Sequence, residues 1–186
     1  MRKIIGKLLI ELGVCIISFV VYINYTTSKA NKEMIEQYKN AINDNNVKKD
    51  EYQIGDVIGV LNIPKIDIEV ALKRGVSDEI LDNAIGHFEN TPMPGEYGNF
   101  AVAGHRAYTK NKFFSNLDKV EIGDEINILQ NETNHKYIVD KIEVVTPDKV
   151  DVVESKDMNK KEITLVTCTP KYVGSHRLIV KGTYVE

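Results

Sequence analysis

A long apolar run near the N-terminus divides this chain of 186 residues into a membrane-type helix and a globular remainder. Between Leu8 and Ile23 the only charged residue is Glu11. A helix from Ile4 to Ile23 is about 30 Å long, which is enough to span a bilayer. Lys7 lies one helical turn before Glu11, so the two charges can neutralise each other near the headgroups. The sequence therefore predicts one N-terminal transmembrane helix.

The basic residues at the N-terminus set the expected orientation of this helix. Arg2, Lys3 and Lys7 precede the apolar run, and positive charge stays on the cytoplasmic side, so we expect the rest of the chain outside the plasma membrane. A cleaved signal peptide is the alternative. Its small-x-small site would have to be Ser28-Lys-Ala30, which lies far beyond the apolar run. We expect an uncleaved, single-pass anchor over residues 1–23.

Residues 24–53 are polar and charged, with apolar side chains at helical spacing. These are Met34, Ile35, Tyr38, Ala41 and Ile42, and they predict an amphipathic helix that ends at the following Asn- and Asp-rich stretch. We expect a polar, partly helical linker that holds a domain off the membrane as a stalk. A helix that folds back over the domain is the alternative.

The remainder, residues 54–186, consists of short β-rich segments separated by turns. The expected strands cover residues 57–63, 66–72, 100–104, 124–129, 136–145 and 163–167, and a last one begins at Arg177. Many short strands with few helices predict a mainly β domain, either a barrel or a sandwich. The net charge of −3, without a basic stripe, argues against a nucleic-acid partner.

Cys168 follows a strand-like segment and is the only cysteine outside the apolar run, which holds Cys15. Pro170 and Gly174 then break the pattern before Arg177 begins the next strand. If the two strands pair as antiparallel neighbours, Arg177 returns to a position beside Cys168. A thiol beside a guanidinium can be a nucleophile with an anion stabiliser. A lone cysteine is otherwise a small buried hydrophobe.

Among the four histidines, His105 is the best partner for the thiol. It ends a strand of small residues, 101–104, which leaves space beside it for a second chain. We expect His87 to cap a helix or lie on the surface and His135 to be solvated in a hairpin turn, and we leave His176 open. The sequence lacks the closely spaced ligand pairs of zinc sites and the EF-hand pattern of calcium sites. We therefore expect no metal and no other cofactor.

Three segments together resemble the sortases, which are membrane-anchored cysteine transpeptidases of Gram-positive cell surfaces. Thr164-Leu-Val-Thr-Cys168 resembles the family's TLxTC strand, and Ala103-Gly-His105-Arg106 resembles its catalytic histidine segment. Arg177-Leu-Ile-Val is similar to the strand that bears the family's arginine. The resemblance covers the anchor and nearly all of the globular part. It implies a closed eight-stranded β-barrel with short helices, in which residues 54–186 form the catalytic domain.

The resemblance also implies a site and a reaction. Cys168 would attack the Thr carbonyl of an LPxTG- or LPxTA-like signal at the C-terminus of a secreted protein and form a thioacyl enzyme. His105 would protonate the leaving amine and then activate the amine of a cell-wall precursor. Arg177 would bind the substrate backbone or the oxyanion, and Thr167 would help to orient the substrate.

Within the family, the segment from Cys168 to Arg177 is most similar to class D. Class C enzymes, the alternative, usually carry a lid with an Asp-Pro-aromatic motif and often a C-terminal membrane helix, which we do not find in the sequence. Two other functions stay open. A membrane-anchored cysteine protease would use water instead of an amine with the same three residues, and a non-catalytic surface adhesion domain would not need its thiol.

Overall fold

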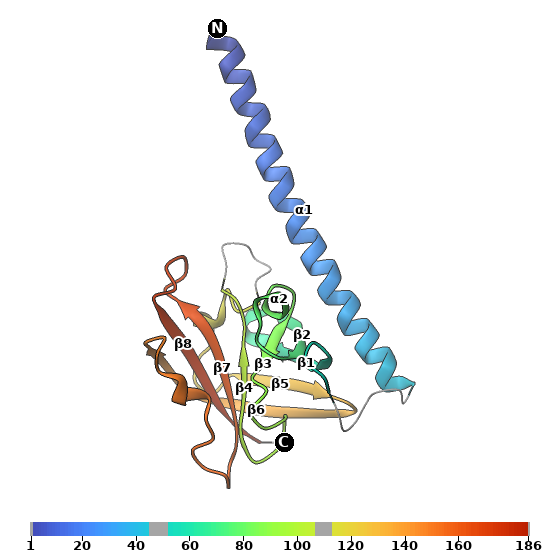
Figure 1. Ribbon diagram of the computed structural model, residues 1–186, viewed down its shortest axis with the longest axis vertical. Coiled ribbons are helices and arrows are strands. Elements are labelled where there is room, and N and C mark those ends of the chain that lie inside the picture. The colour runs from blue at the N-terminus through green and yellow to red at the C-terminus, as the bar shows by residue number, and fades with distance from the viewer. Residues whose placement is uncertain (1, 45–51, 107–112, 186) are drawn as a thin grey trace.

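The structure is a computed structural model that describes residues 2–44, 52–106 and 113–185. It shows one long helix lying along a β-barrel (Figure 1). The helix, α1, runs over Arg2–Asn43. The strands are β1 Val57–Ile63, β2 Ile68–Arg74, β3 Ile85–His87, β4 Gly98–Ala103, β5 Glu125–Gln130, β6 Thr133–Val145, β7 Lys161–Thr169 and β8 His176–Tyr184. Short helical turns join them: η1 Pro64–Ile66, α2 Asp78–Leu81, η2 Leu117–Lys119 and η3 Val150–Val153.

The eight strands close into a barrel in the order β1-β2-β3-β4-β7-β8-β6-β5, and β1 pairs with β5 to complete it. Two neighbouring pairs, β2 with β3 and β4 with β7, are parallel, and the other pairs are antiparallel. Among the eight described strands closure leaves no open edge, which removes a common route to aggregation. The structure confirms the barrel and excludes the sandwich.

The barrel interior is filled by the apolar residues that face inward along each strand. Each fully buried Val, Leu, Ile or Phe side chain contributes about 1.5–3 kcal/mol. Phe114 and Leu117 come from the segment after β4 and belong to the same core cluster. The strand residues of this cluster include Leu61, Ile63, Leu72, Phe100, Val102, Ile126, Ile128, Ile163, Leu165 and Val180.

The N-terminal half of α1 projects away from the barrel. Its apolar side chains, such as Leu9, Ile17 and Phe19, are exposed, and the helix is long and apolar enough to cross a membrane. Lys7 and Glu11 form the expected ion pair, with 3.9 Å between Nζ and Oε1.

The C-terminal half of α1 packs against β1 and β2. Ile35 and Tyr38 are buried in a cluster with Val60 and Ala71, and Asn31 accepts a hydrogen bond from the backbone N–H of Ala71 at 3.0 Å. A stalk that only separates the domain from the membrane is therefore wrong. These residues bury an apolar face, which is the physical reason why the helix lies on the barrel.

The hydroxyl of Tyr38 joins α1 to two parts of the barrel. It donates to the carbonyl of Ile58 at 3.0 Å and accepts from the backbone N–H of Asn131 at 2.9 Å. Lys39 adds an ion pair with Glu69 at 2.8 Å. Burial raises the pKa of Tyr38, so the hydroxyl stays neutral and able to donate. These contacts fix the direction of α1 relative to the strands.

Candidate active site

The parallel ladder between β4 and β7 leads toward His105 and Cys168. Ala103 pairs with Val166 in this parallel ladder. The pairing continues past the end of β4, because the N–H of Gly104 donates to the carbonyl of Val166 at 3.1 Å. Extended by two residues, this register sets His105, which follows β4, opposite Cys168 in β7. Neighbouring strands lie about 4.8 Å apart.

Cys168 and Arg177 are register partners in the antiparallel pair of β7 and β8, as the sequence predicted. Directly opposed residues point to the same face of a sheet. That face is the outside of the barrel, because Val166 and Ile179 belong to an outer apolar cluster, whereas Leu165 belongs to the interior. Both side chains are partly exposed.

The loop between β7 and β8 folds back over the thiol and holds the guanidinium. Gly174 has a φ of +67°, and a Cβ at this position would lie 3.6 Å from the Cβ of Cys168. Nη1 of Arg177 donates to the carbonyls of Gly174 and His176, both at 3.0 Å. Arginine carries five N–H donors, so a guanidinium anchored in this way can still bind a substrate oxygen.

Thr167 fastens the segment that carries the histidine. Its buried hydroxyl donates to the carbonyl of Gly104 at 2.7 Å, one residue before His105. A buried hydrogen bond at this point restrains the position of the imidazole relative to Cys168. This gives Thr167 a positioning role inside the protein, and its contact with substrate stays a prediction.

Arg106 is a further residue of the site, and no role was predicted for it from the sequence. Its side chain is 4% exposed and forms an ion pair with Asp118, with 2.8 Å between Nη2 and Oδ2. Nη1 donates to Oγ1 of Thr169 at 2.9 Å. Arg106 therefore ties the residue after His105 to the residue after Cys168. Its place beside His105 was the available signal, whereas nothing in the sequence points to Asp118.

The space expected beside the small residues 101–104 is occupied at Gly104, which directly follows β4. A Cβ at Gly104 would come within 2.6 Å of the Phe114 ring. The glycine is thus needed because an aromatic side chain of the same chain packs on it. At Gly104 the expected room for a second chain is therefore absent, and the packed ring supports the backbone next to His105.

Two of the other histidines, His87 and His135, lie in β3 and β6, whereas His176 is the register partner of Thr169, next to Cys168. His87 is buried, and its Nε2 lies 3.1 Å from the carbonyl of Pro92 and 3.0 Å from Oγ1 of Thr91. Burial lowers its pKa to about 4. His87 lies in β3, so neither the helix cap nor the surface position expected for it is correct. His135 lies in β6 and is partly buried, which lowers its pKa, so the solvated turn expected for it is also wrong. His176 is exposed, with Oγ of Ser175 2.9 Å from its Nδ1.

Within the described ranges, no group of three His, Cys, Asp or Glu side chains could hold a metal ion.

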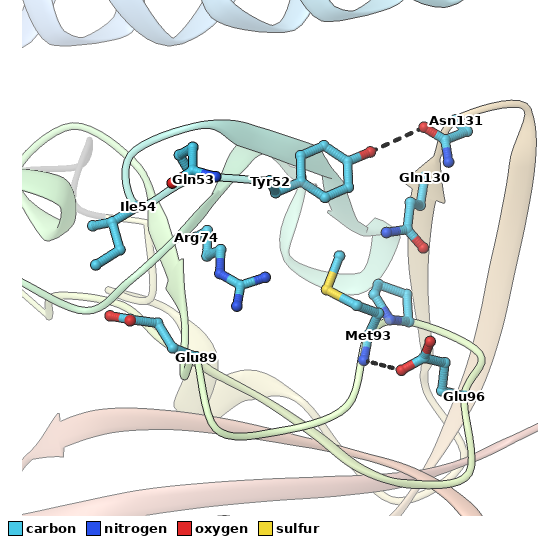
Figure 2. Close-up of a pocket in the computed structure, with 10 residues that line it drawn as sticks. Tyr52, Gln53, Ile54, Arg74, Glu89, Met93, Glu96, Gln130 and Asn131 are labelled. Atoms are coloured by element: carbon cyan, nitrogen blue, oxygen red, sulfur yellow. Dashed lines mark hydrogen bonds between the residues drawn. The ribbon is translucent and has the colours of Figure 1, made fainter. Parts of the chain in front are cut away.

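A hollow of about 630 Å³ lies apart from Cys168, His105 and Arg177. Figure 2 shows the guanidinium of Arg74 pointing into it. Its lining consists of Tyr52, Gln53, Ile54, Arg74, Glu89, Met93, Pro94, Glu96, Gln130 and Asn131. This lining offers neither a thiol nor an imidazole. The chemistry therefore places the candidate active site at the strand ends and not in this hollow.

A closed barrel with a thiol, an imidazole and a guanidinium on three adjacent strand ends has the composition of a cysteine-dependent acyl-transfer enzyme. Comparison with known proteins gives the family. The sortase domain matches residues 61–185. The chain therefore belongs to the sortase family.

Individual relatives agree with this assignment. The chain is 38% identical over 130 residues to Sortase A of Bacillus anthracis, a match that covers 69% of this chain and 60% of that protein. It is 29% identical over 136 residues to Sortase D of Bacillus subtilis, covering 72% and 66%. A solved structure of a Clostridium perfringens Sortase D5 transpeptidase superposes with a TM-score of 0.76 at 38% identity, covering 85% of this chain and 99% of that chain.

The chain spans between 57% and 66% of the length of the first curated relatives that it matches. Proteins named Sortase D and Sortase D5 are among the similar ones, in agreement with the expected likeness to class D.

Proposed function

We propose that this chain is a cysteine transpeptidase that transfers secreted proteins to an amine of the cell wall. The thiol of Cys168 gives its proton to His105, and its sulfur forms a bond to the Thr carbonyl carbon of an LPxT-type signal. The C–N bond then breaks, and the leaving amine takes that proton from His105. An incoming amine gives a proton to His105 and forms the new amide, and the sulfur of Cys168 leaves and takes the proton back as a thiol. Arg177 binds the oxyanion of both tetrahedral intermediates.

One observation carries this proposal: His105, Cys168 and Arg177 stand at the neighbouring ends of β4, β7 and β8, in that order across the sheet. Cys168 lies between the strand that leads to His105 and the strand that begins with the His176–Arg177 pair. Acyl transfer needs a nucleophile with a proton carrier on one side and a charge stabiliser on the other. The match to the sortase family supports the same roles.

The location that we propose follows from α1. Residues 1–23 form the membrane anchor, with the basic N-terminus in the cytoplasm and residues 54–186 outside the plasma membrane. The exposed apolar half of α1 supports this placement. The substrates are then secreted proteins and cell-wall precursors on the outer side of the membrane, and the likeness to Sortase D and D5 supports a class D enzyme.

Product analysis by mass spectrometry tests the proposal. The full chain in detergent is mixed with an LPxTG- or LPxTA-type peptide and a small amine. We expect a peptide that is cut after Thr and joined to the amine, with no such product for Cys168→Ala.

Cleavage with water alone across a panel of amines would instead establish the cysteine protease. No cleavage of any LPxT-type peptide would exclude the proposed substrate class, and unchanged products with Cys168→Ala would exclude the thiol mechanism.

A further inference from the structure

The docked half of α1 runs along the barrel from the end that holds the candidate active site to the opposite end. Ser28 lines a groove of about 690 Å³ together with Phe113 and Lys171, and Lys171 belongs to the loop between β7 and β8. Ten residues later, Tyr38 bonds to Asn131, which lines the hollow in Figure 2. The part of α1 nearest to the apolar run therefore lies at the active-site end.

The apolar run ends close to this point. Ile23 precedes Ser28 by five residues, which is about 7.5 Å along a helix. α1 is one continuous helix from Arg2 to Asn43, so its contacts with β1 and β2 fix the barrel relative to the apolar half. In Figure 1 the loop between β7 and β8 lies at the end of the barrel toward the N-terminus, whereas the C-terminus lies at the other end.

We propose that the active-site end of the barrel faces the membrane and that the tip of the β7–β8 loop, Tyr172 and Val173, lies at the bilayer surface. This inference rests on the proposed insertion of α1 into a membrane. It deepens the proposed function, because it states from which side the substrate reaches Cys168.

The composition of the loop tip suits a lipid–water interface. Tyr172 is 62% exposed and Val173 is 72% exposed, and Nζ of Lys171 lies 6.0 Å from the centre of the Tyr172 ring. Tyrosine rings and lysine side chains combine an apolar body with a polar end, and such residues are favoured at headgroup level. Exposed apolar residues are common on any surface. We assign the bilayer as the partner of this tip because the tip lies at the end of the barrel that faces the apolar half of α1.

This arrangement restricts the substrates that the site meets. The loop that covers Cys168 is also the loop that approaches the lipid. A peptide or an amine held close to the bilayer, by its own anchor, then reaches the thiol without leaving the membrane surface. Substrates tethered in the same membrane are therefore the class that we expect to be favoured over free ones.

Single-tryptophan variants of the full chain test the placement directly, because the natural sequence contains no Trp. Tyr172→Trp places the probe at the loop tip. Tyr97→Trp is the matched control, since Tyr97 is 60% exposed and precedes β4 at the opposite end of the barrel. Phe19→Trp reports the insertion of α1. Each variant is reconstituted in phosphatidylcholine–phosphatidylglycerol vesicles with and without brominated acyl chains, which quench nearby tryptophan.

We expect strong quenching for Phe19→Trp, clear quenching for Tyr172→Trp and none for Tyr97→Trp. Equal quenching at Tyr172 and Tyr97, with Phe19→Trp quenched, would overturn the inference and leave the membrane anchor intact. An unquenched Phe19→Trp would overturn the proposed insertion itself and, with it, this inference.

A spacer in α1 gives an independent measurement. Seven helix-forming residues inserted after Asn24 lift the barrel by about 10 Å and turn it by only about 20°. We expect the quenching at Tyr172→Trp to be lost. The activity on a soluble peptide should stay unchanged, while the activity on a substrate anchored in the same vesicle falls several-fold. Equal activity of the spacer variant and the parent on the anchored substrate would contradict the inference.

Discussion

The two ends of the barrel use their polar groups in different ways. At one end, Cys168 and Arg177 are partly exposed on the outer face of adjacent strands. At the other end, polar groups are partly buried and joined to each other: the hydroxyl of Tyr137 accepts from the N–H of Gly95 at 2.8 Å, and Tyr52 donates to the side chain of Asn131 at 3.0 Å. Exposed polar groups are available for a substrate, whereas paired buried ones stabilise the fold. Substitutions at the first end should change activity, and those at the second should change stability.

The largest expected effect is the loss of activity in Cys168→Ala. Removal of a nucleophile lowers turnover by roughly 10³-fold or more, while a partly exposed thiol contributes little to folding. Peptide turnover and the thermal midpoint measure the two quantities. Cys15→Ala, in the exposed apolar half of α1, is the control and should keep full activity. A Cys168→Ala protein that turns over peptide like its parent would remove the thiol from the mechanism.

Arg177→Lys should follow, with a decrease in kcat of about 10²–10³-fold. Lysine keeps the positive charge, but it lacks the fork of donors that binds the loop carbonyls and an oxyanion together. The control is Arg74→Lys at the opposite end, which should retain parental kcat. Comparable losses of kcat in both variants would mean that the two ends do not differ in the proposed way.

Acidification should destabilise the fold through His87, by about 3 kcal/mol. Burial lowers the pKa of this residue to about 4 in the folded state, against about 6.5 when unfolded. The unfolded chain therefore binds the proton more readily. The stability contributed by the neutral imidazole is complete above pH 6.5 and is lost as pH falls toward 4. Denaturant unfolding of the parent and of His87→Gln across this range measures it, and an equal pH slope in both would refute the assignment.

The smallest of the four effects is expected for Tyr38→Phe, which leaves the carbonyl of Ile58 and the N–H of Asn131 without this hydroxyl. Buried groups that lose their partner cost about 1–3 kcal/mol. We expect a free energy of unfolding about 2 kcal/mol lower, with kcat on a soluble peptide unchanged. Tyr97→Phe, at an exposed position, should match the parent. A Tyr38→Phe protein of parental stability would show that the contacts of α1 with the barrel are weak.

The sequence predicted the parts of the fold that depend on local pattern. Alternating strands and the turn around Pro170 and Gly174 were enough to pair Cys168 with Arg177, and the three motifs named the barrel. The boundaries were less predictable. A strand was expected to begin at residue 136, but β6 already begins at Thr133, which pairs with Gln130, because a two-residue turn closes the hairpin.

Contacts between distant segments were not predictable. The ion pair of Arg106 with Asp118 and the burial of His87 depend on which elements meet in space. The docking of α1 was left as an alternative, because the apolar stripe that contains Ile35 and Tyr38 does not by itself reveal the surface that covers it.

The proposed mechanism requires a covalent acyl group on the sulfur of Cys168. The full chain is incubated with an LPxT-type peptide without an amine, quenched in acid and digested with trypsin, which releases residues 162–171 as a peptide with a single cysteine. We predict that this peptide gains the mass of the acyl portion that ends in Thr, and that the added mass disappears when an amine is supplied. Peptide cleavage that proceeds without any acyl group on Cys168, or with the acyl group on another residue, would contradict the mechanism.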